Sequence, residues 1–275
     1  MKLKYYSLFI LLGLGYTLSA QTLTKVWSTS EGIKTPESAL FDATSNKIYV
    51  SNINGEPSTK DGNGFISVLS ADGKMEKLNW VTGLNAPKGS AIYHGNLYVA
   101  DIDELVIINI KDGKISKRVK VEHAKFLNDV TMSDDGTIFF SDMTANKIYS
   151  YAKGKLELWS EDKLINNPNG VWADKGKLYI GTNQILEADI KTKEIKVVVA
   201  KCGDIDGLQK LGNGQFLYSN WEGRIFITKG GESIKLLDTV ADKKNTADVS
   251  FVPGKNLVLV PTFMANSVDA YQFKP

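Results

Sequence analysis

Internal repetition constrains the fold of this chain more than any other feature of its sequence. Six segments align with one another, and each contains a short strand, a turn with Gly or Asn, and a second apolar strand. The third segment, for example, reads FLNDVTMSDDGTIFFSD from Phe126. A third alternating strand follows every segment, and a polar fourth strand follows most of them, so the unit is roughly 40 residues long. The segments begin at Thr35, Ala86, Phe126, Asn167, Asp204 and Thr246.

Four antiparallel strands per unit, repeated six times, predict an all-β fold, the six-bladed β-propeller, whose blades surround a central channel. The last unit has only three strands before Pro275, while a spare strand, TLTKVWSTS from Thr22, precedes the first unit. We therefore expect the N-terminal strand to complete the sixth blade and close the ring, which leaves no open sheet edge. The regular spacing argues against the alternative, a two-sheet sandwich.

Residues 1–20, MKLKYYSLFILLGLGYTLSA, have the order of a secretory signal peptide, with two lysines, an apolar run and small residues at the end. The apolar run is too short to span a bilayer, and no later stretch is long and apolar enough to do so. An uncleaved membrane anchor is the alternative. We expect a secreted or periplasmic protein in which residues 21–275 form a single propeller domain.

Charge and cysteine content narrow the classes of partner. The chain has 33 Lys and Arg against 31 Asp and Glu, and the two signs balance once Lys2 and Lys4 are removed. This balance does not support a broad basic surface for nucleic acid, and we expect no nucleic-acid partner. Cys202 is the single cysteine, so no internal disulfide forms and stability must come from the core. We expect a monomer that acts on a small-molecule substrate.

One position is polar in every repeat, at the start of the innermost strand. Because the first strand of each blade lines the channel, we expect these six side chains to form a ring at one end of it. The alignment gives this polar column as Glu37, Lys88, Asn128, Asn169, Asp206 and Asp248.

Four members of the polar column can turn oxygen atoms toward a central guest. Two carboxylates and two amides, from Glu37, Asn128, Asn169 and Asp206, form a hard-oxygen set that suits one Ca²⁺ ion in the central channel. The column contains no His or Cys, which disfavours zinc and copper. Two alternatives need no metal: a water-filled channel, or a channel in which Lys88 pairs with Glu37 or Asp248.

The dipeptides around these positions resemble a known family. Pro36-Glu37, Asn128-Asp129, Asn169-Gly170 and Asp206-Gly207 together are similar to the pattern of the senescence marker protein/gluconolactonase/regucalcin group, whose layout paraoxonases and diisopropylfluorophosphatase share. The resemblance covers the chain from about Thr35 to its end. It implies a calcium ion bound by the four oxygen donors and hydrolysis of lactones or related esters. It also implies that Asp206 is the catalytic carboxylate, as general base or as nucleophile.

Two residues depart from the family pattern. Lys88 stands where paraoxonase-like members have His, and Phe126 stands where gluconolactonase-like members have an Arg that grips a sugar-like substrate. Phe126 predicts a more apolar mouth. Lys88 is either a catalytic cation, which orients substrate or stabilises an oxyanion, or a structural ion-pair partner of Glu37 or Asp248.

A second column closes the second strand of each blade and should also rim the mouth, since antiparallel strands return to the end at which they started. Asp142 and Asn220 are candidates for binding substrate or for holding the ligands, and turn formation is the alternative. Asp129 and Asp248 are further candidates for these supporting roles. The column comprises Asn52, Asp101, Asp142, Thr182, Asn220 and Thr262.

Two loops also bear on the site. Asn169-Gly170 has the composition of a hairpin turn, yet its place in the repeat predicts the start of an inner strand, with the turn at residues 174–177. The segment NGEPSTKDGNG from Asn54 is interpreted as a long loop that could cover the channel.

The leading hypothesis is a calcium-dependent hydrolase of lactones or related esters. Because a fold does not fix a function, the rival is a non-catalytic propeller that binds a small ligand or a protein.

Overall fold

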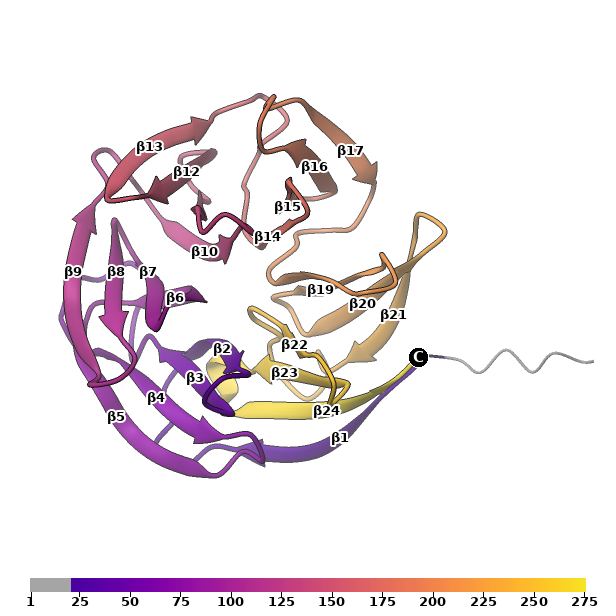
Figure 1. Ribbon diagram of the computed structural model, residues 1–275. Coiled ribbons are helices and arrows are strands. Elements are labelled where there is room, and N and C mark those ends of the chain that lie inside the picture. Colours follow the sequence, from indigo (N-terminus) through magenta and orange to yellow (C-terminus); the bar gives the residue numbers. More distant parts are fainter. Residues whose placement is uncertain (1–20) are drawn as a thin grey trace, which may run out of the picture.

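The computed structural model describes residues 21–275, so the predicted signal peptide lies outside the described residues. Six four-stranded antiparallel sheets surround a central axis (Figure 1). This arrangement confirms the predicted six-bladed β-propeller. Within residues 21–275, no helix is long and apolar enough to cross a membrane.

The strands of each blade follow one another outward from the channel in chain order (Figure 1). Blade one consists of β2 (Pro36–Asp42), β3 (Lys47–Asn52), β4 (Gly64–Ser70) and β5 (Met75–Leu84). Blade two consists of β6 (Pro87–Tyr93), β7 (Asn96–Asp101), β8 (Glu104–Asn109) and β9 (Lys114–Lys120). Blade three consists of β10 (Leu127–Met132), β11 (Ile138–Asp142), β12 (Lys147–Ala152) and β13 (Lys155–Ser160).

The remaining blades repeat this order, apart from the outer strand of the last one. Blade four consists of β14 (Val171–Asp174), β15 (Lys177–Gly181), β16 (Ile185–Asp189) and β17 (Ile195–Val199). Blade five consists of β18 (Leu208–Lys210), β19 (Phe216–Asn220), β20 (Arg224–Lys229) and β21 (Glu232–Asp238). Blade six consists of β22 (Ser250–Val252), β23 (Leu257–Pro261), the short 3₁₀ segment η1 (Phe263–Ala265), β24 (Val268–Lys274) and β1 (Thr22–Thr29).

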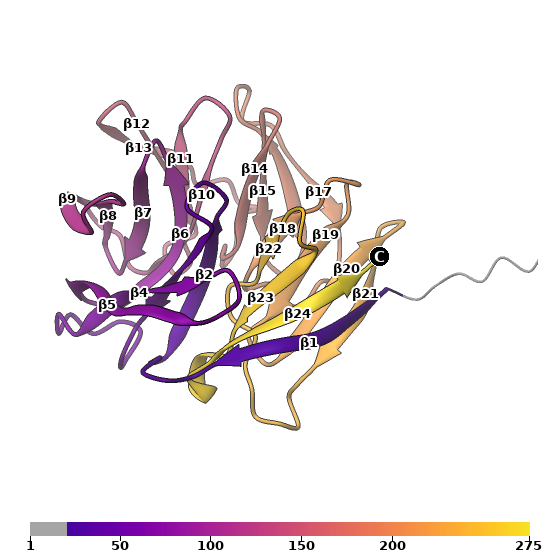
Figure 2. The same ribbon diagram turned by 60° about the horizontal axis from the view of Figure 1, so that its bottom comes forward.

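The first strand of the described chain pairs with its last. β1 runs antiparallel to β24, from Thr22 opposite Lys274 to Thr29 opposite Val268, and forms the outer strand of blade six (Figure 2). A buried carboxylate, Asp269 of β24, joins the two strands. It accepts hydrogen bonds from Lys25 Nζ at 2.6 Å and Ser28 Oγ at 2.5 Å, and Lys244 Nζ lies 3.3 Å away. The spare N-terminal strand thus takes its predicted place.

Apolar side chains form one cluster at each of the six interfaces between neighbouring blades. Successive residues of a strand point to opposite faces, so one strand contributes to two clusters. In β3, Ile48 and Val50 pack against blade six, whereas Tyr49 packs against blade two. The middle strands are therefore apolar on both faces, while outer strands such as β9 expose most of their residues.

As predicted, Asn169-Gly170 does not form a hairpin turn. Asn169 N donates to Gly181 O at 2.9 Å, and Gly170 O accepts from Gly181 N at 2.8 Å, so the dipeptide extends the inner edge of blade four. The turn lies at Lys175 and Gly176, whose φ angles are 48° and 73°. Such left-handed pairs match the twist of the two flanking strands.

The glycine in these dipeptides is explained by close packing at the channel. A Cβ atom on Gly170 would lie 2.4 Å from the carbonyl oxygen of Asp206, and one on Gly207 would lie 2.2 Å from the backbone nitrogen of Val249. Neighbouring inner strands could not approach so closely around any larger residue. These glycines therefore set the width of the channel around the polar column.

Candidate functional site

A pocket of about 420 Å³ opens at one end of the central channel. The four predicted oxygen donors all line it, and we call them the oxygen ring: Glu37, Asn128, Asn169 and Asp206. Lys88 and Phe126 line the same pocket. Five members of the polar column therefore converge as the repeat alignment predicted.

The sixth member of the polar column, Asp248, does not line this pocket, because the sequence alignment of the last repeat is wrong by one residue. The backbone N–H groups of Asn169, Asp206 and Ala247 each donate to a carbonyl in their own blade, at 2.9, 2.8 and 3.1 Å respectively. Ala247, not Asp248, therefore takes the sixth position. Successive residues of a strand face opposite ways, and Asp248 lines a separate hollow of about 600 Å³ that Asp129 also lines.

Three atoms of the oxygen ring lack a hydrogen-bond partner. Glu37 Oε2, Asn128 Oδ1 and Asp206 Oδ1 are buried, and no donor among the described residues reaches them. An unsatisfied buried polar atom costs about 1–3 kcal/mol. Three such atoms in one pocket indicate that a further group, supplied from outside the chain, completes the site.

The sulfur of Met143 lies on the nitrogen side of two side-chain amides of the oxygen ring. Its sulfur lies 3.7 Å from Asn128 Nδ2 and 4.0 Å from Asn169 Nδ2. Thioether sulfur is a weak acceptor that suits an amide nitrogen better than an amide oxygen. The Asn128 oxygen is thereby left for the pocket, where no donor among the described residues reaches it.

Burial perturbs the carboxyl groups of the channel. Burial raises the pKa of Glu37 well above its usual range, and the charge of Asp206 raises it further while Lys88 opposes the shift. Burial likewise raises the pKa of Asp206 to about 7, with a contribution from Asp129 and opposition from the Asn169 amide. The carboxylates repel one another in a space with little solvent, and a cation between them would relieve that repulsion.

Asp129 and Asp248 are two further carboxyl groups near the oxygen ring whose pKa values are raised. Burial raises the pKa of Asp129 to about 7, although its carboxylate accepts hydrogen bonds from Val171 N at 2.6 Å and Val130 N at 2.7 Å. Burial also raises the pKa of Asp248, as do the nearby charges of Asp129, Glu37 and Asp206. Asp129 bridges the inner strands of blades three and four beneath the oxygen ring, which fits the predicted supporting role.

The donor set fits a hard divalent cation. Two carboxylates and two amide oxygens match the ligand preference of Ca²⁺ and leave coordination positions for water or substrate. In the part of the chain that is described, no group of three His, Cys, Asp or Glu side chains is arranged to bind a metal. Metal binding in this pocket would therefore depend on the oxygens of Asn128 and Asn169 as much as on the carboxylates.

Lys88 is buried against backbone carbonyls. Its Nζ donates to Pro57 O at 2.8 Å and to Ala86 O at 2.9 Å, and lies 4.4 Å from the centre of the Phe126 ring. Burial lowers the pKa of Lys88 to about 8, against the charge of Glu37. No carboxylate in residues 21–275 lies within ion-pair distance of its Nζ, so of the two alternatives for Lys88 the geometry does not support the ion pair with Glu37 or Asp248.

The long loop of blade one reaches the mouth. Glu56 and Pro57 line the pocket, and the Pro57 carbonyl is one of the two acceptors of Lys88. Farther along the loop, Lys60 forms an ion pair with Asp103 of blade two at 2.5 Å. The loop thus forms part of the pocket wall and is tied to the neighbouring blade at two points.

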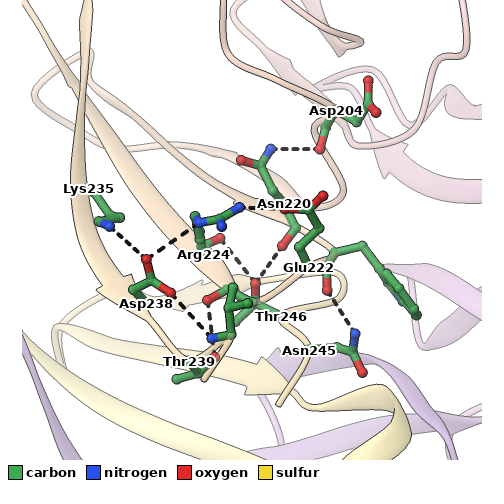
Figure 3. Close-up of polar contacts among 12 residues, drawn as sticks. Asp204, Asn220, Glu222, Arg224, Lys235, Asp238, Thr239, Asn245 and Thr246 are labelled. Atoms are coloured by element: carbon green, nitrogen blue, oxygen red, sulfur yellow. Dashed lines mark hydrogen bonds and ion pairs between the residues drawn. The ribbon is translucent and has the colours of Figure 1, made fainter. Parts of the chain in front are cut away.

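Members of the second column support the oxygen ring from behind. Asp142 accepts hydrogen bonds from Lys125 N at 2.8 Å and Phe126 N at 3.0 Å, just before Asn128. Asn220 Nδ2 donates to Asp204 O at 2.6 Å, just before Asp206 (Figure 3). Neither Asp142 nor Asn220 lines the pocket. Asn52 and Asp101 bind the equivalent segments of blades one and two at Lys34 N and Ala86 N. Of the two predicted roles, the geometry supports holding the ligands.

Sequence reasoning missed most of the apolar lining of the pocket. Ile53, Met143, Trp221 and Phe263 line it, and each directly follows a member of the second column. This adjacent position is apolar in five repeats, with Asn183 as the exception, and therefore carried a signal. The signal resembles that of core residues, which explains why it was overlooked.

The chain matches no known family model and no curated protein at the level of sequence. Its fold is similar to a gluconolactonase-family protein, with 15% identity, a TM-score of 0.66 and 93% of each chain covered. It is also similar to a catalytically inactive virginiamycin B lyase from Staphylococcus aureus with quinupristin, with 12% identity, a TM-score of 0.62, and 92% of this chain and 99% of that chain covered. A WD40 β-propeller domain of Doa1 has 11% identity and a TM-score of 0.65, over 86% of this chain and 78% of that chain.

At these identities the similarity establishes the fold alone. Fold and site together define a six-bladed β-propeller with an oxygen-lined pocket at one mouth of its channel.

Proposed function

We propose that this protein is a calcium-dependent hydrolase of lactones or related esters, with its active site in the pocket that the oxygen ring lines. The observation that carries the proposal is the convergence of three buried, unpaired oxygens, from Glu37, Asn128 and Asp206, on one pocket. The resemblance of the inner-strand dipeptides to the gluconolactonase group supports the same reaction class.

The oxygen ring would bind the cation, and its residues would also perform part of the chemistry. Calcium, when bound, supplies Lewis acidity that polarises a substrate carbonyl. Asp206 Oδ1 is free of protein partners and can accept the proton of an attacking water, or attack the carbonyl carbon itself. The Asn169 amide next to Asp206 favours its ionised form, which either role requires.

Lys88 is the second candidate catalytic residue. An ammonium group has three N–H donors, and the carbonyls of Pro57 and Ala86 accept two hydrogen bonds from Lys88. The third donor can stabilise negative charge that develops on the substrate oxygen. Because Lys88 lines the pocket and has no carboxylate partner among residues 21–275, its positive charge is available to the substrate.

Metal analysis and a lactone panel test the proposal. The protein is stripped with chelator, dialysed and titrated with Ca²⁺ by calorimetry, and hydrolysis of lactones and aryl esters is measured with and without the ion. Asp206→Ala should abolish turnover and weaken Ca²⁺ binding, while Asp72→Ala, a change to an exposed turn carboxylate, should do neither. Absence of Ca²⁺ binding, or chelator-insensitive turnover, would refute the proposal.

A non-catalytic propeller that binds a small ligand is the second candidate. Backbone carbonyls already accept hydrogen bonds from two of the three N–H groups of Lys88. Lys88 could therefore have only the structural role of holding the loop of blade one. Ligand binding in the pocket without turnover of any ester would favour this candidate.

We also propose that the protein is a secreted or periplasmic monomer. The N-terminal sequence of residues 1–20 supports export. N-terminal sequencing of the protein from cell fractions tests the cleavage, and light scattering of the purified protein tests its mass in solution.

A further inference from the structure

Three apolar side chains stand at the mouth of the pocket, and we call Trp221, Phe263 and Met264 the mouth shelf. Trp221 is 43% exposed and Met264 is 66% exposed. The other large apolar residues exposed in the described part of the chain lie outside this pocket. Exposed apolar groups that gather at a cavity mark binding surfaces, because their contact with water is unfavourable.

The mouth shelf is held by contacts between two blades. Trp221 lies in the turn between β19 and β20, and the other two residues belong to η1 between β23 and β24. Asn245 joins these segments: its Nδ2 donates to Trp221 O at 3.1 Å, and its Oδ1 accepts from Met264 N at 3.3 Å. The shelf is thus fixed before any ligand arrives, which reduces the entropy lost on binding.

The aromatic rings of the shelf are also packed. Those of Trp221 and Phe263 meet edge to face with their centres 5.6 Å apart. Phe263 packs in addition against a buried cluster of Ile53, Ala86 and Ile102. This packing leaves the exposed surface of Trp221 as a rigid platform rather than a mobile side chain.

An apolar wall connects the shelf to the oxygen ring. Ile53 and Pro57 line it from blade one, Phe126 and Met143 from blade three, and Ile205 from blade five. One face of the Phe126 ring is covered by the Lys88 ammonium group. A molecule that fills the pocket would therefore have its polar end at the ring and an apolar body along this wall.

We propose that the substrate carries an aryl or extended alkyl group, which lies on the mouth shelf while its lactone or ester carbonyl reaches the oxygen ring. This inference rests on the proposed hydrolase function. Aromatic rings and thioether sulfur bind apolar rings and chains favourably. A polyhydroxylated acyl group, by contrast, would lose hydrogen bonds to water along the apolar wall.

Three six-membered lactones that carry different groups on the lactone ring test the inference. Dihydrocoumarin has a fused aryl ring, δ-valerolactone is bare, and D-glucono-1,5-lactone is polyhydroxylated. Relative to its uncatalysed hydrolysis rate, the bare lactone should have a higher kcat/KM than the polyhydroxylated one. Trp221→Ala should lower kcat/KM for dihydrocoumarin about tenfold, mainly through KM, and change it less than about twofold for δ-valerolactone. Comparing variants on each substrate cancels the intrinsic reactivity of the lactones.

Two further variants make the comparison specific. Leu158→Ala removes an apolar side chain with the same 43% exposure from β13, outside the pocket, and should alter neither substrate. Asn245→Ala should reproduce part of the Trp221→Ala loss on dihydrocoumarin, since it releases the shelf without removing a ring. An unchanged ratio of kcat/KM for dihydrocoumarin to that for δ-valerolactone in Trp221→Ala would overturn the inference. The highest kcat/KM relative to the uncatalysed rate for the polyhydroxylated lactone would also overturn it.

A non-hydrolysable ligand separates the inference from the hydrolase proposal. The lactam of dihydrocoumarin, 3,4-dihydro-2-quinolone, is titrated into wild type and Trp221→Ala by calorimetry. Binding that depends on Trp221, without turnover of any lactone, would support the apolar ligand class and refute only the hydrolase. Turnover that Trp221→Ala leaves unchanged, with no lactam binding, would refute the inference and leave the hydrolase standing.

Discussion

The contact between the first and last strands gives the sharpest prediction about stability. Asp269 is fully buried, and Asp269→Asn keeps its shape while removing the charge that binds Lys25 and Ser28. Breaking a buried ion pair typically costs about 3–5 kcal/mol. The Lys25 side chain is 40% exposed and can recover hydration, so we expect about 2 kcal/mol here. For a domain of this size the melting temperature should fall by about 4–8 °C.

The effect of pH supplies a second measurement on the same residue. Burial raises the pKa of Asp269, but hydrogen bonds from Lys25 and Ser28 outweigh it, and the net pKa is lowered. The stabilisation is therefore present above the unfolded pKa of about 3.9 and is lost as pH falls toward the folded value. The difference between wild type and Asp269→Asn should be constant between about pH 7 and pH 5 and shrink below about pH 4.

Scanning calorimetry at several pH values checks both parts of this prediction. Asp72→Asn, which removes one partner of the exposed pair with Lys74, is the control and should leave the melting temperature unchanged. A double-mutant cycle with Lys25→Met isolates the pair. An Asp269→Asn protein as stable as wild type, or a difference that grows in acid, would show that this contact does not hold β1 in place.

Other features of the channel give further predictions. Gly207→Ala should destabilise the fold by about 1–3 kcal/mol in urea, because its Cβ would lie 2.2 Å from Val249 N, whereas Gly212→Ala, with open space around it, should not. Lys88→Met should leave the Pro57 and Ala86 carbonyls without a donor and lower the free energy of unfolding by about 1–3 kcal/mol. Proteolysis of the loop at residues 54–64 should then be faster than in wild type, and equal cleavage rates would contradict this. Asp142→Ala should weaken Ca²⁺ binding although Asp142 is not one of the proposed ligands, because the substitution releases the backbone at Phe126, just before Asn128. An unchanged Ca²⁺ affinity in calorimetry would exclude this supporting role.

The sequence predicted the architecture because the blade is encoded locally and six times over. Hairpin turns such as Lys175-Gly176, and the apolar runs between them, recur at a regular spacing. Six copies of the pattern make the assignment of the strands insensitive to an atypical residue in any one repeat. The same redundancy placed Glu37, Lys88, Asn128, Asn169 and Asp206 in one pocket, although those residues are far apart in the chain.

The errors arose where the repeats are least alike or where contacts are not local. In the last repeat, Ala247 and Asp248 are adjacent, and the polar residue was chosen because the other repeats are polar at this position. The backbone register chose Ala247 instead. Lys88 meets the carbonyl of Pro57 across 31 positions, and no pattern within one repeat specifies such a contact. The sequence therefore left a charged partner for Lys88 open as one alternative, whereas backbone carbonyls accept its hydrogen bonds.

The pairing of β1 with β24 also has a consequence for the order of folding. The Lys25–Asp269 contact spans 244 positions, so the first strand of the propeller has no partner until the last has been synthesised. Blades one to five draw all their strands from one continuous stretch of chain and can form as synthesis proceeds. The sixth blade must wait, and joining contacts so distant in sequence is slow. Closure of the ring of blades is thus the last step of folding, and a chain truncated before β24 would leave β1 without its partner strand.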